Sequence, residues 1–249
     1  MARLTKRLTA LALTLLLPAA TQAAQCGSAI YDPANYVCHD NQFLCPVVNG
    51  EGLSYCNGAC YSRFMYQCVN SGTVLAQLPR LDDGARFALR AWNPTSTAVH
   101  NKPVAACGRT WTVGGPTCAY CPVEVVGAAC PAGNATAMAY PGAMNAMVPG
   151  GQAYYLDANW GVGYTQAHSA SVPLGATLGG LVAYQGGGFV NLNGPGTNWV
   201  ACPPTAGGDG TGWRLRSENA TTAGDRGNCV GINLAVEIVA NQASAWQYT

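Results

Sequence analysis

The chain has 249 residues, of which 49% are hydrophobic and only 9% are charged, so its composition excludes an intrinsically disordered protein. The formal net charge is +1, but three of the basic residues lie within the first seven positions. Without them, nine basic residues face eleven acidic ones. Nucleic-acid binding needs a basic surface, so we expect no nucleic-acid partner.

The first residues have the pattern of a secretory signal peptide. A basic segment over residues 1–7 precedes ten apolar residues, a run too short to span a bilayer, and small residues follow at 21–24. The last residues lack the apolar tail of a lipid-anchor signal. We expect a signal peptide over residues 1–24 and a secreted protein, extracellular or associated with a cell wall, with no membrane partner. Two Asn-x-Thr sequences are glycosylation candidates in that compartment, Asn134 and Asn219.

Twelve cysteines indicate disulfides in an oxidising compartment. They form two even sets: Cys26, Cys38, Cys45, Cys56, Cys60 and Cys68, then Cys107, Cys118, Cys121, Cys130, Cys202 and Cys229. This split predicts a cysteine-rich module over 25–78, a linker over 79–84 and a second stapled domain over 85–249. The Cys-x-x-Cys at 118–121 has no second such pair, so we expect neither a metal nor a cofactor.

An internal repeat lies within the first set of cysteines. Five residues recur at a constant offset of thirty: Cys26, Ala29, Tyr31, Tyr36 and Cys38 match Cys56, Ala59, Tyr61, Tyr66 and Cys68. This predicts a duplicated small unit. Six cysteines allow fifteen pairings. The economical hypothesis is that Cys26–Cys38 and Cys56–Cys68 close equivalent loops, and that Cys45–Cys60 joins the two units.

The second half of the chain has the pattern of β-structure. Short, mostly alternating segments lie at 87–92, 109–113, 153–156, 162–165, 213–216 and 232–239. Turns rich in Gly, Pro and Asn separate them, at 149–151, 186–188, 193–196 and 207–210. We therefore expect a small disulfide-rich module followed by an all-β domain, either a sandwich or a barrel.

The repeated tyrosines suggest sugar binding. A module of about fifty residues has little core, so several of its aromatic rings should be exposed. A tyrosine ring offers an apolar face to a sugar ring and a hydroxyl to water. We expect four stacking platforms, Tyr31, Tyr36, Tyr61 and Tyr66, with Asp32 and Asn57 as hydrogen-bonding partners, and a gain in avidity from two units. The alternative is that these tyrosines pack on the disulfides and fill a small core.

The cysteine spacing, with Tyr-Asp-Pro at 31–33 and Phe-Leu-Cys-Pro at 43–46, resembles a fungal cysteine-rich carbohydrate-binding module. That module occurs on some secreted endo-1,3-β-glucanases and on non-catalytic wall proteins. The resemblance covers residues 26–75 and implies binding to a cell-wall polysaccharide, with β-glucan favoured and chitin possible. The second copy departs from the first, with Ser62 and Arg63 in place of Asp32 and Pro33.

The second half resembles secreted fungal proteins labelled IgE-binding or cell-wall proteins. Four segments carry this resemblance, at 120–126, 147–152, 161–170 and 199–203. It implies a location outside the cell and transfers no catalytic residue.

An enzyme would need a different pattern of residues. Glycosidases use two carboxylates that flank the scissile bond, whereas the acidic residues of the second half are scattered. His168-Ser169 lies outside any Gly-x-Ser-x-Gly elbow. We therefore expect a secreted, non-catalytic carbohydrate-binding protein. Two alternatives stay open: a polysaccharide hydrolase whose second half is catalytic, and a structural wall protein or effector without sugar affinity.

Overall fold

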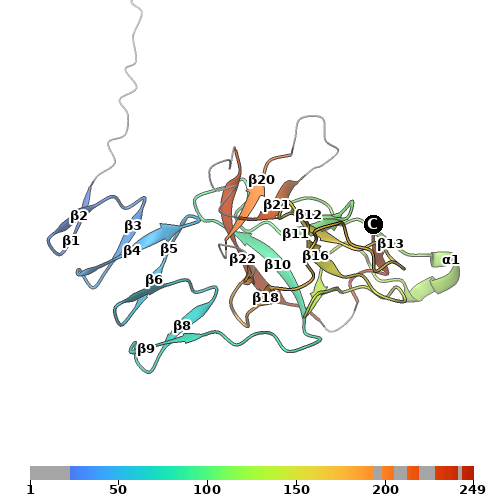
Figure 1. Cartoon of the computed structure of the whole chain (residues 1–249), viewed down its shortest axis with the longest axis horizontal. Coiled ribbons are helices and arrows are strands. Elements are labelled where there is room, and N and C mark those ends of the chain that lie inside the picture. The colour runs from blue at the N-terminus through green and yellow to red at the C-terminus, as the bar shows by residue number, and fades with distance from the viewer. Residues whose placement is uncertain (1–22, 193–197, 205–211, 219–227, 241–242) are drawn as a thin grey trace, which may run out of the picture.

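The computed structural model describes residues 23–192, 198–204, 212–218, 228–240 and 243–249 (Figure 1). Most of the expected signal peptide, the turns at 193–196 and 207–210, and Asn219 lie outside the described residues. Within the described part of the chain, no helix is long and apolar enough to cross a membrane. The structure is a disulfide-rich region followed by a nearly all-β domain, as the sequence predicts.

The disulfide-rich region consists of two copies of one unit, which we call unit 1 (24–48) and unit 2 (54–78). Unit 1 contains β1 (Ala24–Cys26), β2 (Ala29–Tyr31), β3 (Tyr36–His39) and β4 (Phe43–Val48). Unit 2 contains β6 (Ser54–Cys56), β7 (Ala59–Tyr61), β8 (Tyr66–Val69) and β9 (Val74–Gln77), and the short β5 (Glu51–Gly52) lies between the units. Each unit is two antiparallel hairpins, and the first hairpins of the two units have equivalent registers. The pairing of β8 with β9 is shifted by one residue relative to that of β3 with β4, because the turn between β8 and β9 is one residue longer. The thirty-residue repeat is therefore a structural duplication.

The disulfides of the two units are those that the repeat predicts. Cys26–Cys38 and Cys56–Cys68 close equivalent loops, and Cys45–Cys60 joins the units. Each closed loop of this size removes about 3 kcal/mol of unfolded-state entropy in a chain-entropy account. This cross-linking compensates for the small core of the region.

The second domain, here called the barrel, holds the other three disulfides. They are Cys107–Cys118, Cys121–Cys130 and Cys202–Cys229. The Cys-x-x-Cys residues thus belong to two different bridges. Among the described residues, no group of three or more His, Cys, Asp or Glu is placed to hold a metal ion.

Antiparallel strands make up most of the barrel. In chain order they are β10 (Arg86–Trp92), β11 (Val104–Cys107), β12 (Thr110–Val113), β13 (Ala119–Tyr120), β14 (Met138–Ala139), β15 (Ala143–Met144), β16 (Tyr154–Leu156), β17 (Val162–Tyr164), β18 (Leu181–Ala183), β19 (Phe189–Asn191), β20 (Trp199–Cys202), β21 (Trp213–Ser217), β22 (Val230–Ile238) and β23 (Gln247–Tyr248). One helical turn, α1 (Val123–Val126), and a 3-10 turn (Gly127–Ala129) lie inside the Cys121–Cys130 loop. The six segments expected from alternation are all strands. Sequence analysis did not predict the other strands of the barrel, which are β11, β13, β14, β15, β18, β19, β20 and β23.

The main sheet of the barrel closes on itself. Its order is β15-β14-β10-β22-β20-β21-β12-β17-β16, with β11 paired to β12. The two end strands also meet, because Met144 N donates to Gln152 O (2.8 Å) and Tyr154 N donates to Gly142 O (3.0 Å). Of the two expected architectures, the structure therefore has the barrel. Closure leaves no free edge in this sheet.

Aromatic side chains fill the interior of the barrel. The β18–β19 hairpin places Phe189 at their centre, with its ring 5.6 Å from that of Trp199 and 5.8 Å from that of Phe87. Trp111 and Tyr154 complete the cluster at 6.1 and 5.9 Å. The interior is a packed hydrophobic core that positions the outer surfaces of the strands.

Candidate functional site

The turn between β2 and β3 is built around Asp32. Its backbone carbonyl accepts hydrogen bonds from Asn35 N (3.0 Å) and Tyr36 N (3.1 Å). Its carboxylate accepts from Ala34 N (2.9 Å) and from Asn35 Nδ2 (3.0 Å). A carboxylate has about four acceptor positions. Asp32 thus shapes the turn and keeps acceptor capacity for a hydroxyl group.

Tyr31 and Tyr36 flank this turn, one on each side. The Tyr36 side chain is 43% exposed and lies next to the exposed Val37, while Tyr31 is half-buried. Ile30 is 77% exposed on β2. Exposed apolar and aromatic side chains on a disulfide-linked scaffold make a rigid surface, which lowers the entropy cost of binding. Unit 1 therefore offers an accessible aromatic surface.

Asn57 has a structural role. It adopts a left-handed backbone conformation (φ 43°) between β6 and β7. Its Nδ2 donates to Thr73 O (3.1 Å), which links the two hairpins of unit 2. Its position in unit 1 is Gly27, whose N–H donates to Asn41 Oδ1 (3.0 Å) in an equivalent link between hairpins.

Tyr61 and Tyr66, in contrast, lie toward the barrel. Tyr61 lines a cavity of about 50 Å³ whose wall also includes Val190 and Asn233 of the barrel. Tyr66 pairs with Gln77 across β8 and β9, and Gln77 Nε2 donates to the Tyr184 hydroxyl (2.8 Å). Burial raises the pKa of Tyr184, and the nearby Tyr66 adds to the shift. The structure therefore separates the four predicted tyrosines into two pairs with different surroundings.

An aromatic cluster that sequence analysis did not single out joins the two units. The Tyr55 ring lies 4.6 Å from the Phe43 ring and is stacked 5.9 Å from the His39 ring. His39 Nε2 is also hydrogen-bonded to Leu53 O (2.9 Å). The repeat could not reveal this cluster, because the thirty-residue offset pairs none of its members with another aromatic residue. All three rings are half-buried, so the cluster braces the junction between the units.

Several acidic residues of the barrel have structural roles. Asp157 Oδ1 accepts from Asn159 N (2.7 Å) and Gly161 N (2.9 Å) in a tight turn. Glu237 forms a two-point ion pair with Arg90 (2.7 and 3.2 Å), which raises the pKa of that guanidinium. Asp209 and Asp225 lie outside the described residues.

His168 and Ser169, which sequence analysis did not assign to catalysis, lie in an irregular loop. His168 has a left-handed backbone conformation (φ 61°) and lines a shallow cavity of about 460 Å³. Ser169 Oγ accepts from Ser171 N (3.1 Å), a local turn contact. Asn134, the described glycosylation candidate, is exposed, whereas Thr136 of the same sequence is buried and accepts from Ala106 N (2.8 Å).

Comparisons with known proteins match both regions. Residues 25–72 match the family described as "Carbohydrate binding", and residues 87–249 match the family described as "PhiA-like secreted protein". The molecule is thus a secreted protein with a carbohydrate-binding module and a barrel domain. Because the second match covers more than half of the chain, the protein belongs to the PhiA-like secreted protein family.

Two curated relatives are similar to parts of this chain. An "Uncharacterized secreted protein" of Arthroderma benhamiae is 36% identical over 177 residues, which are 68% of this chain and 88% of the relative. The "Primary septum glucan endo-1,3-beta-D-glucosidase" of Schizosaccharomyces pombe is 49% identical over 43 residues, which are 17% of this chain and 4% of the relative. No solved structure matches the chain.

Proposed function

We propose that the protein is a non-catalytic, cell-wall-associated protein that binds β-1,3-glucan through the exposed aromatic surface of unit 1. The observation that carries this proposal is the placement of Tyr31 and Tyr36 on either side of an exposed turn in a carbohydrate-binding module. The proposed site comprises the two tyrosine rings, the exposed Ile30 and Val37, and the remaining acceptor capacity of Asp32.

Stacking is the expected mode of contact. The C–H face of a glucose ring packs on a tyrosine ring, and each such contact contributes about 1 kcal/mol by analogy with aromatic pairs. Hydroxyl groups of the sugar donate to the Asp32 carboxylate. An uncharged polymer suits a chain in which only 9% of the residues are charged. The similarity to a segment of a glucan endo-1,3-beta-D-glucosidase supports β-1,3-glucan over chitin as the ligand.

The roles of the barrel carboxylates support a non-catalytic protein. Glycoside hydrolysis needs an acid and a second carboxylate, about 5 to 10 Å apart across a groove. Asp157 is held in a turn and Glu237 in an ion pair on the outer surface. We propose that the barrel presents the module at the wall and leaves the polymer intact.

Sedimentation with insoluble β-1,3-glucan tests this proposal. The wild-type protein should pellet with the glucan, and the double variant Tyr31→Ala/Tyr36→Ala should bind more weakly by roughly thirtyfold, for two contacts of about 1 kcal/mol each. Tyr120→Ala is the matched control, because Tyr120 is 52% exposed but lies on the barrel. It should pellet like the wild type.

Three outcomes would contradict the proposal. Wild-type protein that stays in the supernatant would exclude glucan binding and favour a structural wall protein. Stronger sedimentation with chitin would change the ligand. Release of reducing sugar from soluble β-1,3-glucan by the purified protein would favour the hydrolase alternative.

A further inference from the structure

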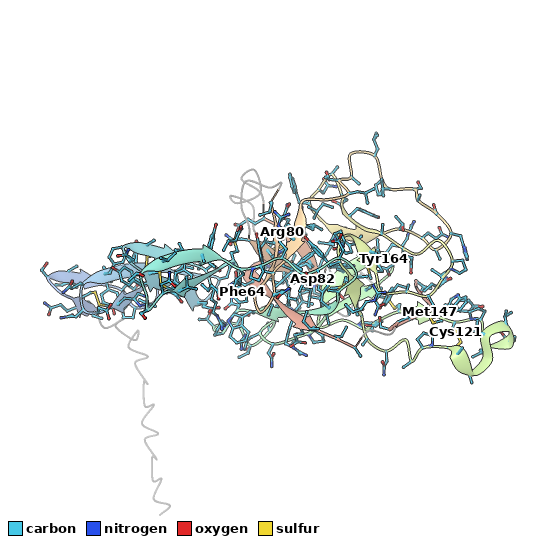
Figure 2. All side chains as sticks on the ribbon, turned by 90° about the horizontal axis from the view of Figure 1, so that it is seen from below. Phe64, Arg80, Asp82, Cys121, Met147 and Tyr164 are labelled. Carbon is cyan, nitrogen blue, oxygen red and sulfur yellow. A yellow bond between two sulfur atoms is a disulfide. The ribbon has the colours of Figure 1, made fainter. Side chains whose placement is uncertain are left out.

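We infer that unit 2 is a docking element that fixes the module to the barrel, so that the protein carries one glucan-binding unit rather than two. The statement about glucan rests on the proposed function, whereas the docking itself rests on contacts between unit 2 and the barrel. Figure 2 shows Phe64 of unit 2 at the junction of the two regions.

The two units have the same turn with different side chains. Residues 32–35 read Asp-Pro-Ala-Asn, and the equivalent residues 62–65 read Ser-Arg-Phe-Met. The Ser62 carbonyl accepts from the amides of Met65 (3.1 Å) and Tyr66 (3.0 Å), as the Asp32 carbonyl does in unit 1. Ser62 Oγ accepts from Phe64 N (3.3 Å), again as Asp32 does. Only the outward side chains distinguish the turns.

Phe64 is the centre of the contact with the barrel. Its side chain is 7% exposed, whereas the equivalent Ala34 is in solvent. Its carbonyl accepts from Gly188 N (2.8 Å) in the β18–β19 turn. A Cβ at Gly188 would lie 2.8 Å from the Phe64 Cβ, so this close approach requires a glycine.

Two further side chains of unit 2 extend this contact. Met65 and Leu78 pack on a small buried cluster formed by Val182, Tyr184 and Val190 of the barrel. Phe189 of the β18–β19 hairpin faces the core of the barrel, whereas Tyr184 belongs to the cluster on the opposite, outer face of the hairpin. Tyr184 is nevertheless fully buried. Unit 2 therefore covers barrel side chains that would be exposed without it.

Arg63 occupies the position of the exposed Pro33. Its guanidinium lies over the ring of Trp92 on the barrel, 4.8 Å from the ring centroid, and forms an ion pair with Glu51. A cation over a tryptophan ring contributes favourably, and most when water is excluded. Arg63, Phe64 and Met65 thus each have a partner at the junction.

Hydrogen bonds to the barrel, before and after unit 2 in the chain, restrict the motion of this unit. Before it, Asn49 Nδ2 donates to Ile232 O (3.0 Å) on β22. After it, Leu81 N donates to Ala183 O (2.9 Å), and Gln185 N donates to Pro79 O (2.9 Å). The expected linker at 79–84 therefore begins as a segment bound along the β18–β19 hairpin.

This docking decides which tyrosines can reach a polymer. Tyr61 and Tyr66 belong to the docked unit and lie toward the barrel, whereas Tyr31 and Tyr36 flank an exposed turn. Tyr61 and Tyr66 are half-buried, and the barrel beside them limits the approach of a rigid polysaccharide chain to their rings. The protein should bind one short β-1,3-linked oligosaccharide per chain and gain no avidity from its second unit.

The docking is tested without any sugar by restoring the unit 1 turn in unit 2. The variant Arg63→Pro/Phe64→Ala/Met65→Asn should give a larger radius of gyration in X-ray scattering and faster proteolysis within residues 79–84. Ile30→Ala, which truncates an exposed side chain of unit 1, is the control and should change neither. A variant with the wild-type radius and cleavage rate would overturn the docking.

A measurement on the wild-type protein covers the case in which that variant does not fold. The amides of Leu81 and Gly188 donate across the junction. In hydrogen exchange they should be protected like the barrel core and far more than the exposed turn at 32–35. Exchange at the rate of that turn would contradict a fixed junction.

Calorimetry with a soluble β-1,3-linked hexasaccharide tests the number of sites. We expect one equivalent per chain, loss of binding in Tyr31→Ala/Tyr36→Ala, and an unchanged affinity in folded Tyr61→Ala/Tyr66→Ala. Two equivalents would overturn the single site and leave the proposed function standing. An absence of heat together with an absence of sedimentation would overturn the proposed function, while scattering and exchange still decide the docking.

Discussion

The two units share one scaffold and differ in their surroundings. Their disulfides span the same Cα–Cα distance of 5.7 Å, and the same carbonyl closes the turn after β2 and after β7. In unit 1 that turn lies in solvent, and in unit 2 it carries Phe64 into the junction with the barrel. The comparison teaches that a turn held by backbone hydrogen bonds can exchange its outward side chains without changing its shape. One unit can then bind a ligand while its copy binds the rest of the protein.

The largest expected effect concerns Phe64. Phe64→Ala removes a nearly buried ring from the junction and should lower the free energy of unfolding by about 3 kcal/mol, the usual cost of such a cavity. Urea denaturation followed by tryptophan fluorescence measures it, because the tryptophans all lie from Trp92 onward. Truncation of the exposed Ile30 to alanine should stay within about 0.5 kcal/mol. Equal losses of unfolding free energy in Phe64→Ala and Ile30→Ala would contradict the burial of unit 2 at the junction.

Alkaline pH should destabilise the barrel and leave the exposed surface of unit 1 unaffected. Burial raises the pKa of Tyr154 and of Tyr164 in the barrel to about 12. The unfolded chain loses these protons near pH 10, so the contribution of the two tyrosines to the free energy of unfolding is fully present below pH 10 and is lost as the pH rises to 12. For Tyr154 the loss amounts to about 2 kcal/mol at the upper end of that range.

Tryptophan fluorescence during an alkaline titration checks this expectation. The free energy of unfolding of the barrel should fall between pH 10 and 12. Tyr154→Phe should weaken the pH dependence, although it also removes the hydrogen bond from Gly142 N (2.7 Å). Tyr36→Phe, on the exposed surface of unit 1, is the control. A barrel whose stability does not change up to pH 12 would contradict the assigned burial.

The smallest expected effect concerns the first residue of each turn. Asp32→Ala and Ser62→Ala each remove one side-chain acceptor for a turn amide, at a cost of about 1 kcal/mol. Thermal unfolding should show similar losses for the two variants. Glucan affinity should fall in Asp32→Ala only, because in the proposed site that turn alone faces the polymer. A matching loss of affinity in Ser62→Ala would show that unit 2 also binds sugar.

The cysteine pairing of the module was predictable because a period constrains it. Once Cys26 and Cys38 recur as Cys56 and Cys68, equivalent loops require equivalent bridges, and two cysteines are left to join the units. The pairing in the barrel had no such constraint. Its cysteines follow no repeat, so their bridges depend on which strands become neighbours.

The candidate site was predictable in part. The tyrosines and Asp32 are predicted to bind sugar from their residue types and the Tyr-Asp-Pro pattern, and this stays a prediction. The repeat presented the two units as equal. The departure at Ser62 and Arg63 was visible, yet its meaning was not, because the partner of Arg63 is the distant Trp92. The role of Asn57 was also missed, since its link to Thr73 depends on how two hairpins meet.

A secreted chain, a duplicated disulfide-linked unit and β-strands with their turns could all be recognised from the sequence alone. Spacing, alternation and turn residues act over short distances along the chain, so they can be recognised without a fold. The tertiary structure decided that the sheet closes into a barrel and that unit 2 is covered while unit 1 is free. Both depend on contacts between residues far apart in the chain, such as Tyr154 with Gly142 across the closing strands and Phe64 with Gly188 at the junction. Burial belongs to the assembled molecule, and it separates the turn of unit 2, with its buried Phe64, from the turn of unit 1, with its exposed Ala34.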